Sequence, residues 1–346
     1  MIKPVKTSLA AYGMSGRVFH APLIHYSSYF ELTNVMQRSS NSCKENYPNV
    51  DIVKEFDDLL DSNTELIIIN TPDYLHYEQA LKAIDAGKHV VLEKPFVQNV
   101  LQGEELINKA SEKGVILSVF HNRRWDNNFL TVKKIIEEDT LGNIVEYRAR
   151  YDRYRPQVKN SWKENPQNRT SILYNLGSHI IDQALHLFGM PQYVSANMAI
   201  MRDGALVDDF FNIALTYPNK FVELAASYLV KEPSPSYIVN GVKGSYIKYG
   251  EDPQEAALAS GVIPDSNNWG EDCEEYYGVL NVECSDRSYR SKIKTVKGNY
   301  HYFYNNIYRA VKLNDSLNVT AKQALDVIRV IEAAKISSNE KRYVKL

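Results

Sequence analysis

The sequence has few cysteines, no long apolar run and no excess of charge of one sign. Its only cysteines, Cys43, Cys273 and Cys284, form no CxxC pair, so neither a disulfide framework nor a zinc site is encoded and no bound metal is expected. No stretch approaches the ~20 apolar residues of a membrane span, and the apolar stretch before Gly13 is too short for a signal peptide. These absences predict a cytoplasmic protein with no membrane partner.

Charge and length narrow the class further. The 40 basic and 42 acidic side chains give a formal net charge of -2, so no global field attracts nucleic acid, and none is expected as a partner. A chain of 346 residues is longer than one ordinary hydrophobic core serves, which predicts two domains and room for a small-molecule cleft.

The first third of the chain alternates short apolar runs with amphipathic stretches, the pattern of a parallel sheet joined by crossover helices. The expected strands cover residues 5–12, 30–37, 66–70, 89–92 and 115–120. The expected helices cover residues 57–60, 77–86 and 103–113, and Gly87 and Gly114 are placed to end two of them. Residues 1–122 are therefore predicted to form the first domain.

The pattern changes after Arg124. A helix is expected at 129–138 and alternating strands at 144–151 and 210–217, which predicts a largely antiparallel sheet in a second domain, residues 123–346. The domain ends in an amphipathic helix at 320–334, with Thr320 as its N-cap. Residues 251–275 contain eight acids and no Lys or Arg, and we interpret them as a solvated loop region.

A dinucleotide motif follows the first expected strand. The sequence AYGMSG is a near match to GxGxxG, with Ala11 in place of the first glycine. Gly13 would let the backbone approach a pyrophosphate, and Gly16 would allow close helix packing. Together with Met14 and Ser15 they are expected to hold the phosphates at the start of the following helix.

The end of the second expected strand bears on the cofactor. An acid there would hold the ribose 2′-hydroxyl of NAD, but the chain has Gln37, Arg38, Ser39 and Ser40. Arg38 is suited to pair with a 2′-phosphate and Ser39 to donate a hydrogen bond, so NADP is expected in preference to NAD. The alternative is an ordinary exposed arginine in a loop.

Two further segments carry candidate catalytic groups. Glu93, Lys94 and Pro95 follow the fourth expected strand, at the edge where open parallel sheets bind ligands. Farther along, Asn175 precedes His179 by four residues, so the two share a face if the stretch is helical. A histidine of near-neutral pKa suits the base that takes a hydroxyl proton as hydride leaves. A lone histidine on an apolar helix is more often structural.

Several motifs, taken together, resemble the Gfo/Idh/MocA oxidoreductase family over essentially the whole chain. The motifs are AYGMSG, FHAPLI, NTPDYLHYEQA, AGKHVVLEKPF, SVFHNRRWDNNF and LGSHIIDQALHLFGMP. The stretches HNRRWDNNFLT, RYRP, GSHIIDQ, IKYGEDPQEAAL and WGEDCEEYYG are most similar to the NADP-dependent scyllo-inositol 2-dehydrogenases within it.

The resemblance implies an α/β protein with an N-terminal Rossmann domain and a C-terminal α/β domain whose sheet is open and mostly antiparallel. It implies hydride transfer between NADP(H) and a cyclitol or sugar carbon, with Lys94 touching the reacting hydroxyl and cofactor, and His179 as the acid/base. The residues implied at the cofactor are Asn70, Thr71, Pro72, His76 and Glu93. The residues implied at the substrate are Asn122, Arg123, Trp125, Tyr151, Arg153, Tyr154 and Asp182. The open sheet has an apolar face to bury, which favours a homo-oligomer, with a dimer expected.

Asn175 leaves more than one function open, because the family has Asp at this position. The leading hypothesis is a dehydrogenase or reductase of an inositol or related polyol, in which the amide of Asn175 orients the imidazole of His179 without supplying negative charge. A dinucleotide-binding sensor or regulatory protein is the second hypothesis. A glycosidase that returns the hydride within each cycle is the third, and Arg38 argues against it because such an enzyme keeps NAD.

Overall fold

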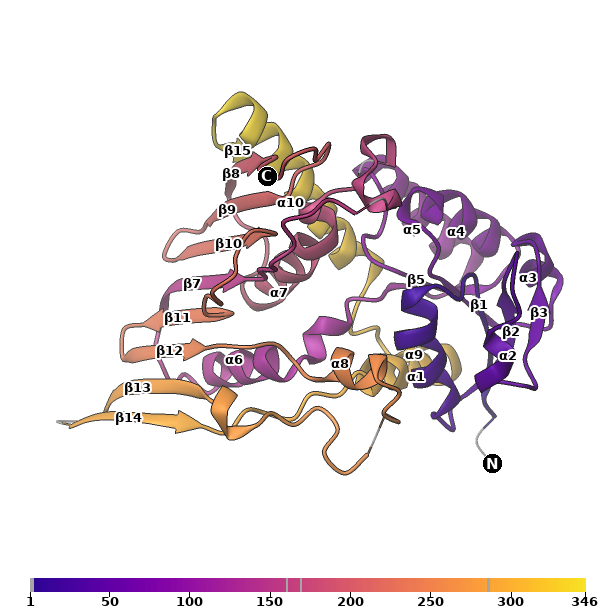
Figure 1. Ribbon diagram of the computed structural model, residues 1–346, viewed down its shortest axis with the longest axis horizontal. Coiled ribbons are helices and arrows are strands. Elements are labelled where there is room, and N and C mark those ends of the chain that lie inside the picture. The colour runs from indigo at the N-terminus through magenta and orange to yellow at the C-terminus, as the bar shows by residue number, and fades with distance from the viewer. Residues whose placement is uncertain (1–2, 160, 169, 265, 285–286) are drawn as a thin grey trace. The chain divides into compact units, whose positions relative to one another are not determined.

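The computed structural model in Figure 1 describes residues 3–159, 161–168, 170–264, 266–284 and 287–346. The chain divides into two compact units. The first comprises Met1–Asn122, Gln254–Trp269 and Asn299–Leu325, and the second comprises Arg123–Pro253, Gly270–Gly298 and Asp326–Leu346. The first unit is therefore discontinuous, since two later segments return to it. The domains 1–122 and 123–346 stay a prediction, and the compact units differ from them in these two segments.

The first unit is built on a six-stranded parallel sheet. Its strands are β1 (Val5–Leu9), β2 (Phe30–Met36), β3 (Asp51–Val53), β4 (Leu66–Ile69), β5 (His89–Leu92) and β6 (Leu117–Val119). They lie in the order β3-β2-β1-β4-β5-β6, and all four residues of β4 are fully buried. This is the doubly wound order of dinucleotide-binding domains, in which ligands bind beyond the carboxyl ends of the strands where the order reverses.

Helices cover both faces of this sheet, with α4 and α5 on one side and α1 and α9 on the other (Figure 1). The helical elements are η1 (Gly16–His20, a π-helix), α1 (Ala21–His25), α2 (Cys43–Asn46), α3 (Asp57–Asp61), η2 (Asp73–Leu75), α4 (His76–Asp85), α5 (Val100–Lys113), α8 (Gln254–Ala259) and α9 (His301–Leu313). Gly87 and Gly114 follow α4 and α5 with φ of 72° and 64°, which confirms them as helix ends.

The second unit contains a nine-stranded mixed sheet. Its strands are β7 (Ile144–Arg150), β8 (Tyr193–Ala199), β9 (Phe210–Thr216), β10 (Phe221–Ser227), β11 (Tyr237–Gly241), β12 (Gly244–Lys248), β13 (Gly278–Cys284), β14 (Arg287–Ile293) and β15 (Val344–Lys345). Their order is β14-β13-β12-β11-β7-β10-β9-β8-β15, visible as successive arrows in Figure 1. Among the described residues of this sheet only β7 and β10 pair in parallel, so the sheet is mostly antiparallel, as predicted.

The second unit also has helical elements. They are α6 (Asn127–Glu137), η4 (Trp162–Glu164), η5 (Pro166–Asn168), η6 (Leu173–Gly177, a π-helix), α7 (Ser178–Phe188) and η7 (Glu274–Tyr276); η3 (Asn122–Trp125) and α10 (Ala321–Glu340) span the division between the units. The ring of Phe188 on α7 lies 5.3 Å from that of Tyr147 on β7. Alternate residues of β9, Phe211, Ile213 and Leu215, are buried beneath these helices.

Some expectations about local structure were wrong. The first strand ends at Leu9 instead of residue 12, and β3 was missed because three residues carry no readable periodicity. The last helix begins after Thr320 as predicted, because the Thr320 hydroxyl accepts from the Gln323 N–H at 3.1 Å, but it runs on to Glu340. Among the described residues, no helix has both the length and the apolar character to cross a membrane.

The interpretation of residues 251–275 as a solvated loop region holds only in part, because most of the segment is exposed but some of its acids are buried. Asp252 is buried and accepts the Asn127 N–H at 2.6 Å, and Asp272 lies 2.8 Å from the fully buried Lys248 ammonium. The segment includes the short helix α8, and Asp265 lies outside the described residues. The number of acidic residues in the segment predicted exposure, but it could not show that Asn127 and Lys248, from distant segments, supply buried donors to two of them.

Candidate functional site

The glycine-rich loop leads from the carboxyl end of β1 into η1. A Cβ at Gly16 would lie 2.3 Å from the Ala11 carbonyl oxygen and 2.8 Å from Asn70 Nδ2, so no other residue fits there without movement of the backbone. A Cβ at Gly13 would meet nothing within 4 Å, which leaves this side of the loop open. The loop therefore requires glycine at position 16 for packing, whereas the space beside Gly13 is open.

Asn70 holds this loop from the end of β4. Its Oδ1 accepts the Ala11 N–H at 2.9 Å, and its Nδ2 donates to the Ala11 carbonyl at 2.8 Å. The side chain thus satisfies both backbone groups of the residue that replaces the first glycine. Sequence reasoning placed Asn70 at the nicotinamide ribose and missed this contact, which joins residues far apart along the chain.

The loop after β2 carries the groups expected near a 2′-phosphate. Buried Gln37 donates to the Ser40 hydroxyl at 2.7 Å and accepts the Cys43 N–H at 2.9 Å, which folds the loop around its side chain. Lys54, just after β3, donates to the Gln37 carbonyl at 3.0 Å. Arg38 is exposed. The structure therefore brings a second cation to this loop, which the sequence could not reveal once β3 was missed.

The ends of β4 and β5 are joined by His76. Its Nδ1 lies 2.9 Å from the Pro95 carbonyl oxygen and its Nε2 lies 3.1 Å from that of Thr71. Burial lowers the pKa of His76, although the hydrogen bonds to the two backbone oxygens favour the protonated ring. The Lys94–Pro95 peptide bond is cis. His76 thus links the segment after β4 to the segment after β5 through the backbone oxygens of Thr71 and Pro95.

Glu93 directly precedes Lys94 at the end of β5. One carboxylate oxygen, Oε2, accepts the Lys94 N–H at 3.0 Å, and the other, Oε1, lies 3.1 Å from His20 Nε2. The second ring nitrogen of His20 lies 2.6 Å from the Tyr304 hydroxyl. Neither His20 nor Tyr304 was proposed from the sequence, although His20 lies within the FHAPLI motif.

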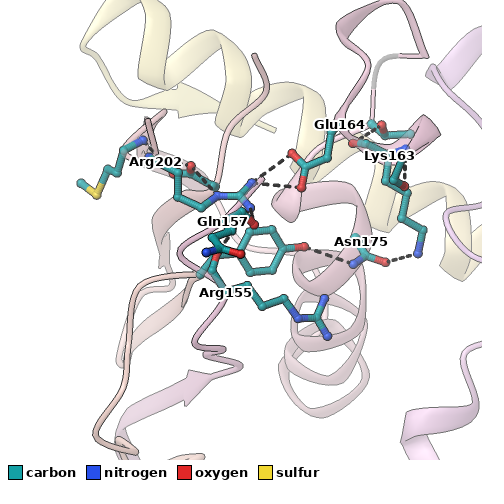
Figure 2. A network of polar contacts seen from close by, with 11 residues as sticks. Arg155, Gln157, Lys163, Glu164, Asn175 and Arg202 are labelled. Carbon is teal, nitrogen blue, oxygen red and sulfur yellow. Dashed lines mark hydrogen bonds and ion pairs between the residues drawn. The ribbon is translucent and has the colours of Figure 1, made fainter. Parts of the chain in front are cut away.

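In the second unit, Asn175 and His179 lie on the helix formed by η6 and α7. Asn175 Oδ1 accepts from Lys163 Nζ at 3.2 Å, and its Nδ2 donates to the Tyr228 hydroxyl at 3.4 Å (Figure 2). His179 is buried, with its ring 6.3 Å from that of Tyr151. The stretch is helical, with Asn175 in its π-helical part, Leu173–Gly177, and the shared face of Asn175 and His179 stays a prediction.

Figure 2 shows how the segment that carries Lys163 is held. The guanidinium of Arg202 donates to both oxygens of Glu164 at 3.1 and 3.0 Å and to the carbonyls of Arg155 and Gln157 at 3.4 Å. Its side chain is 1% exposed, so the ion pair is shielded from water. The network therefore fixes the segment next to Asn175.

The two arginines expected at the substrate, Arg123 and Arg153, lie beside the ring of Tyr151, which is expected there too. The guanidinium carbons of Arg123 and Arg153 lie 4.9 and 4.4 Å from the centroid of the Tyr151 ring. Arg123 also pairs with Asp126 at 3.2 Å, and Arg153 forms an ion pair with Glu251. Stacking and pairing hold both guanidinium groups in place.

The remaining expected residues lie in varied surroundings. Asp182 accepts from Arg124 at 2.8 and 2.7 Å in a buried bidentate pair, so both its oxygens have a protein partner. Asn122 is buried at the start of η3, which ends at Trp125, and Tyr154 is half exposed. The structure thus groups Arg123, Tyr151 and Arg153 and places Asp182 in an ion pair.

The comparisons with known proteins match both parts of the chain. Residues 8–121 match the family model described as oxidoreductase family, NAD-binding Rossmann fold, and residues 133–346 match the oxidoreductase family, C-terminal alpha/beta domain. The chain belongs to the Gfo/Idh/MocA oxidoreductase family. The resemblance seen in the sequence is confirmed, as is the predicted fold class.

Relatives in this family cover the whole chain. A scyllo-inositol 2-dehydrogenase (NADP+) of Bacillus subtilis is 42% identical over 346 residues, which cover 100% of this chain and 97% of that protein. The solved structure of a putative oxidoreductase from Bacteroides fragilis is 46% identical with a TM-score of 0.92, and it covers 99% of this chain and 100% of its own. A Bacillus subtilis oxidoreductase structure has a TM-score of 0.96 at 41% identity and covers 100% of this chain and 99% of its own.

Proposed function

We propose that the chain is an NADP-dependent dehydrogenase that transfers hydride between the cofactor and a secondary alcohol of a cyclitol or sugar, with a scyllo-inositol-like substrate. The observation that carries this proposal is the placement of Lys94 at the carboxyl end of β5 in a doubly wound sheet, with its backbone bonded to Glu93. The name of the Bacillus subtilis relative supports the substrate class and the cofactor.

In this proposal NADP+, when bound, would supply the hydride acceptor, and residues of the chain would take the proton. The alcohol carbon loses hydride and its hydroxyl loses a proton, which leaves a ketone. The ammonium of Lys94 donates a hydrogen bond to the reacting oxygen, which favours the alkoxide that forms as the proton leaves. His179 accepts that proton, as suits an imidazole, and Asn175 acts with it as the orienting residue. The Lys163 contact fixes which end of the Asn175 amide is the acceptor.

The cofactor preference rests on the loop after β2. Arg38 and Lys54 supply positive charge there, and the Ser39 side chain is suited to donate to a phosphate oxygen. Gly13, Met14, Ser15 and Gly16 would hold the pyrophosphate. Thr71, Pro72, His76 and Glu93 belong to the strand ends next to the nicotinamide in this proposal.

The substrate would be held by donor-rich side chains of the second unit. Arg123, Arg153 and Tyr151 form the stacked group described above, and such donors suit a ligand covered in hydroxyls. Trp125, Tyr154 and Asp182 of the second unit, with Asn122 at the end of the first segment of the first unit, complete the proposed set.

The test is turnover with a defined panel of polyols. NADP+ reduction is followed by absorbance against scyllo-inositol, myo-inositol and several aldoses, with NAD+ in parallel, for the native protein, Lys94→Ala and Asn175→Asp. We expect native turnover with NADP+ and its loss in Lys94→Ala. Tight cofactor binding without turnover of any polyol would refute the dehydrogenase proposal, and preference for NAD+ would refute the role of Arg38.

We also propose that the open face of the nine-stranded sheet pairs with a second copy of the chain. Tyr193, Phe221 and Ile247 lie on the face opposite buried Tyr147 and are 39%, 45% and 36% exposed. Light scattering on the native protein should give a dimer mass, and Phe221→Asp should lower it. A native monomer would refute this assignment.

A further inference from the structure

A line of three buried ionisable side chains ends at the backbone of Lys94. Glu93 comes from the end of β5, His20 from the end of η1 and Tyr304 from α9, and all belong to the first unit. His20 and Tyr304 are 0% exposed and Glu93 is 9% exposed. The distances are 3.1 Å from Glu93 Oε1 to His20 Nε2 and 2.6 Å from His20 Nδ1 to the Tyr304 hydroxyl.

The surroundings of this line are aromatic. The ring of Phe120 lies 4.5 Å from that of His20 and 5.7 Å from that of Tyr304, and Phe303 lies 4.9 Å from Phe120. In such surroundings a misplaced proton or an unpaired charge is costly, because little water is present to solvate it. The hydrogen-bond directions along the line are therefore well defined.

The directions follow from which groups hold protons. Burial alone would raise the pKa of Glu93, but the hydrogen bond from His20, together with the charge of Lys94, outweighs it and lowers that pKa. Burial, with the charge of Glu93, raises the pKa of Tyr304 well above its ordinary value. An ionised carboxylate can only accept, so His20 Nε2–H donates to Glu93, and in the neutral imidazole Nδ1 is then the acceptor for the Tyr304 O–H.

The carboxylate of Glu93, at one end of this row of side chains, also contacts Lys94. The second oxygen of Glu93 accepts the Lys94 N–H at 3.0 Å, so the carboxylate that His20 orients also fixes the backbone from which the Lys94 side chain extends. A buried anion beside Lys94 favours the charged form of the lysine. An ion pair located elsewhere in the sheet would neither fix the Lys94 backbone nor favour the charged form of the Lys94 side chain.

We propose, resting on the proposed function, that His20 and Tyr304 are positioning residues for Lys94 and act through Glu93. They keep the Glu93 carboxylate ionised and oriented, so that Lys94 stays charged and directed at the reacting oxygen. His20→Phe removes the donor to Glu93, and Glu93→Gln removes the anion. Tyr304→Phe leaves the His20–Glu93 bond but frees the choice of His20 tautomer, so its effect is smaller.

The first arm of the test is kinetic. In His20→Phe we expect kcat to fall by about 10- to 100-fold, the range for residues that orient a functional group, while the KM for the polyol and the affinity for NADP+ stay near native values. The alkaline limb of the pH profile moves to lower pH. His20→Gln keeps an N–H donor and should recover part of kcat. Tyr308→Phe, which loses a hydroxyl on the same helix, is the matched control.

The second arm does not depend on turnover. The extent of Lys94 acylation by a small reagent is measured against pH by peptide mass mapping in the native protein, Glu93→Gln, His20→Phe and Tyr308→Phe. We expect half-maximal modification at lower pH in the first two variants and no change in Tyr308→Phe. Native pH dependence of Lys94 in folded variants would overturn the inference, even if the protein is a dehydrogenase. An inactive native protein in which the shift is present would refute only the proposed function.

Discussion

The clamp that Asn70 places on Ala11 makes a quantitative prediction for cofactor binding. Asn70→Ala removes two neutral hydrogen bonds, of 2.9 and 2.8 Å, to the loop expected to hold the pyrophosphate. Each such bond contributes about 1 kcal/mol net, so the loop loses about 2 kcal/mol of preorganisation. If binding must restore the same loop conformation, the Kd for NADPH rises about 30-fold.

The assay is fluorescence titration of NADPH with each variant. Gln79→Ala is a matched control, since the Gln79 side chain bonds to Thr71, next along the chain to Asn70, instead of to the loop, so a smaller change is expected. Asn70→Asp keeps one acceptor for the Ala11 N–H but places a second oxygen against the Ala11 carbonyl, so it should not restore binding. An unchanged Kd in Asn70→Ala would show that the loop needs no clamp, and the reasoning would fail.

Three further predictions concern packing and charge. Gly16→Ala should abolish NADPH binding in a folded protein, because its Cβ would lie 2.3 Å from the Ala11 carbonyl oxygen, and retained binding in the same titration would contradict the steric argument. Arg124→Leu should lower the free energy of unfolding by about 3–5 kcal/mol, measured in urea, because it leaves Asp182 charged and buried, whereas the double change to leucine should recover much of this loss. Burial, followed by the charge of Arg124, lowers the pKa of His186 to about 4, below its ordinary value of 6.5, so the unfolded chain binds more protons between these values. Stability should therefore fall as pH drops through this window, and a His186→Gln protein with the same slope would refute the assignment.

The sequence predicts those features that depend on neighbouring residues. The run Leu66–Ile69 reads as a buried strand because all of its side chains are apolar, and Gly87 reads as a helix end because it follows an amphipathic stretch. The π-helical turns at η1 and η6 leave no such pattern, because they alter the hydrogen-bond register without altering the composition.

Contacts across long sequence separations could not be predicted in the same way. The family resemblance implied Asn70 and His76 near a cofactor, and their backbone partners become apparent only once the strands are aligned. The link from His20 to Tyr304 spans most of the chain. A single sequence shows which residues have side chains suited to binding or catalysis, but not which of these side chains are in contact in the folded protein.

The return of α9 to the first unit has a consequence for synthesis on the ribosome. The strands β1–β6 emerge first, but α9, which packs beside α1 and contributes Phe303 and Tyr304 to the core around Phe120, emerges only after most of the second unit. The part of the sheet face that α9 covers therefore waits for its cover while nearly two hundred residues are added. We expect the apolar surface exposed in this interval to favour association with chaperones, and a chain interrupted before residue 301 to be more sensitive to proteolysis than the whole chain.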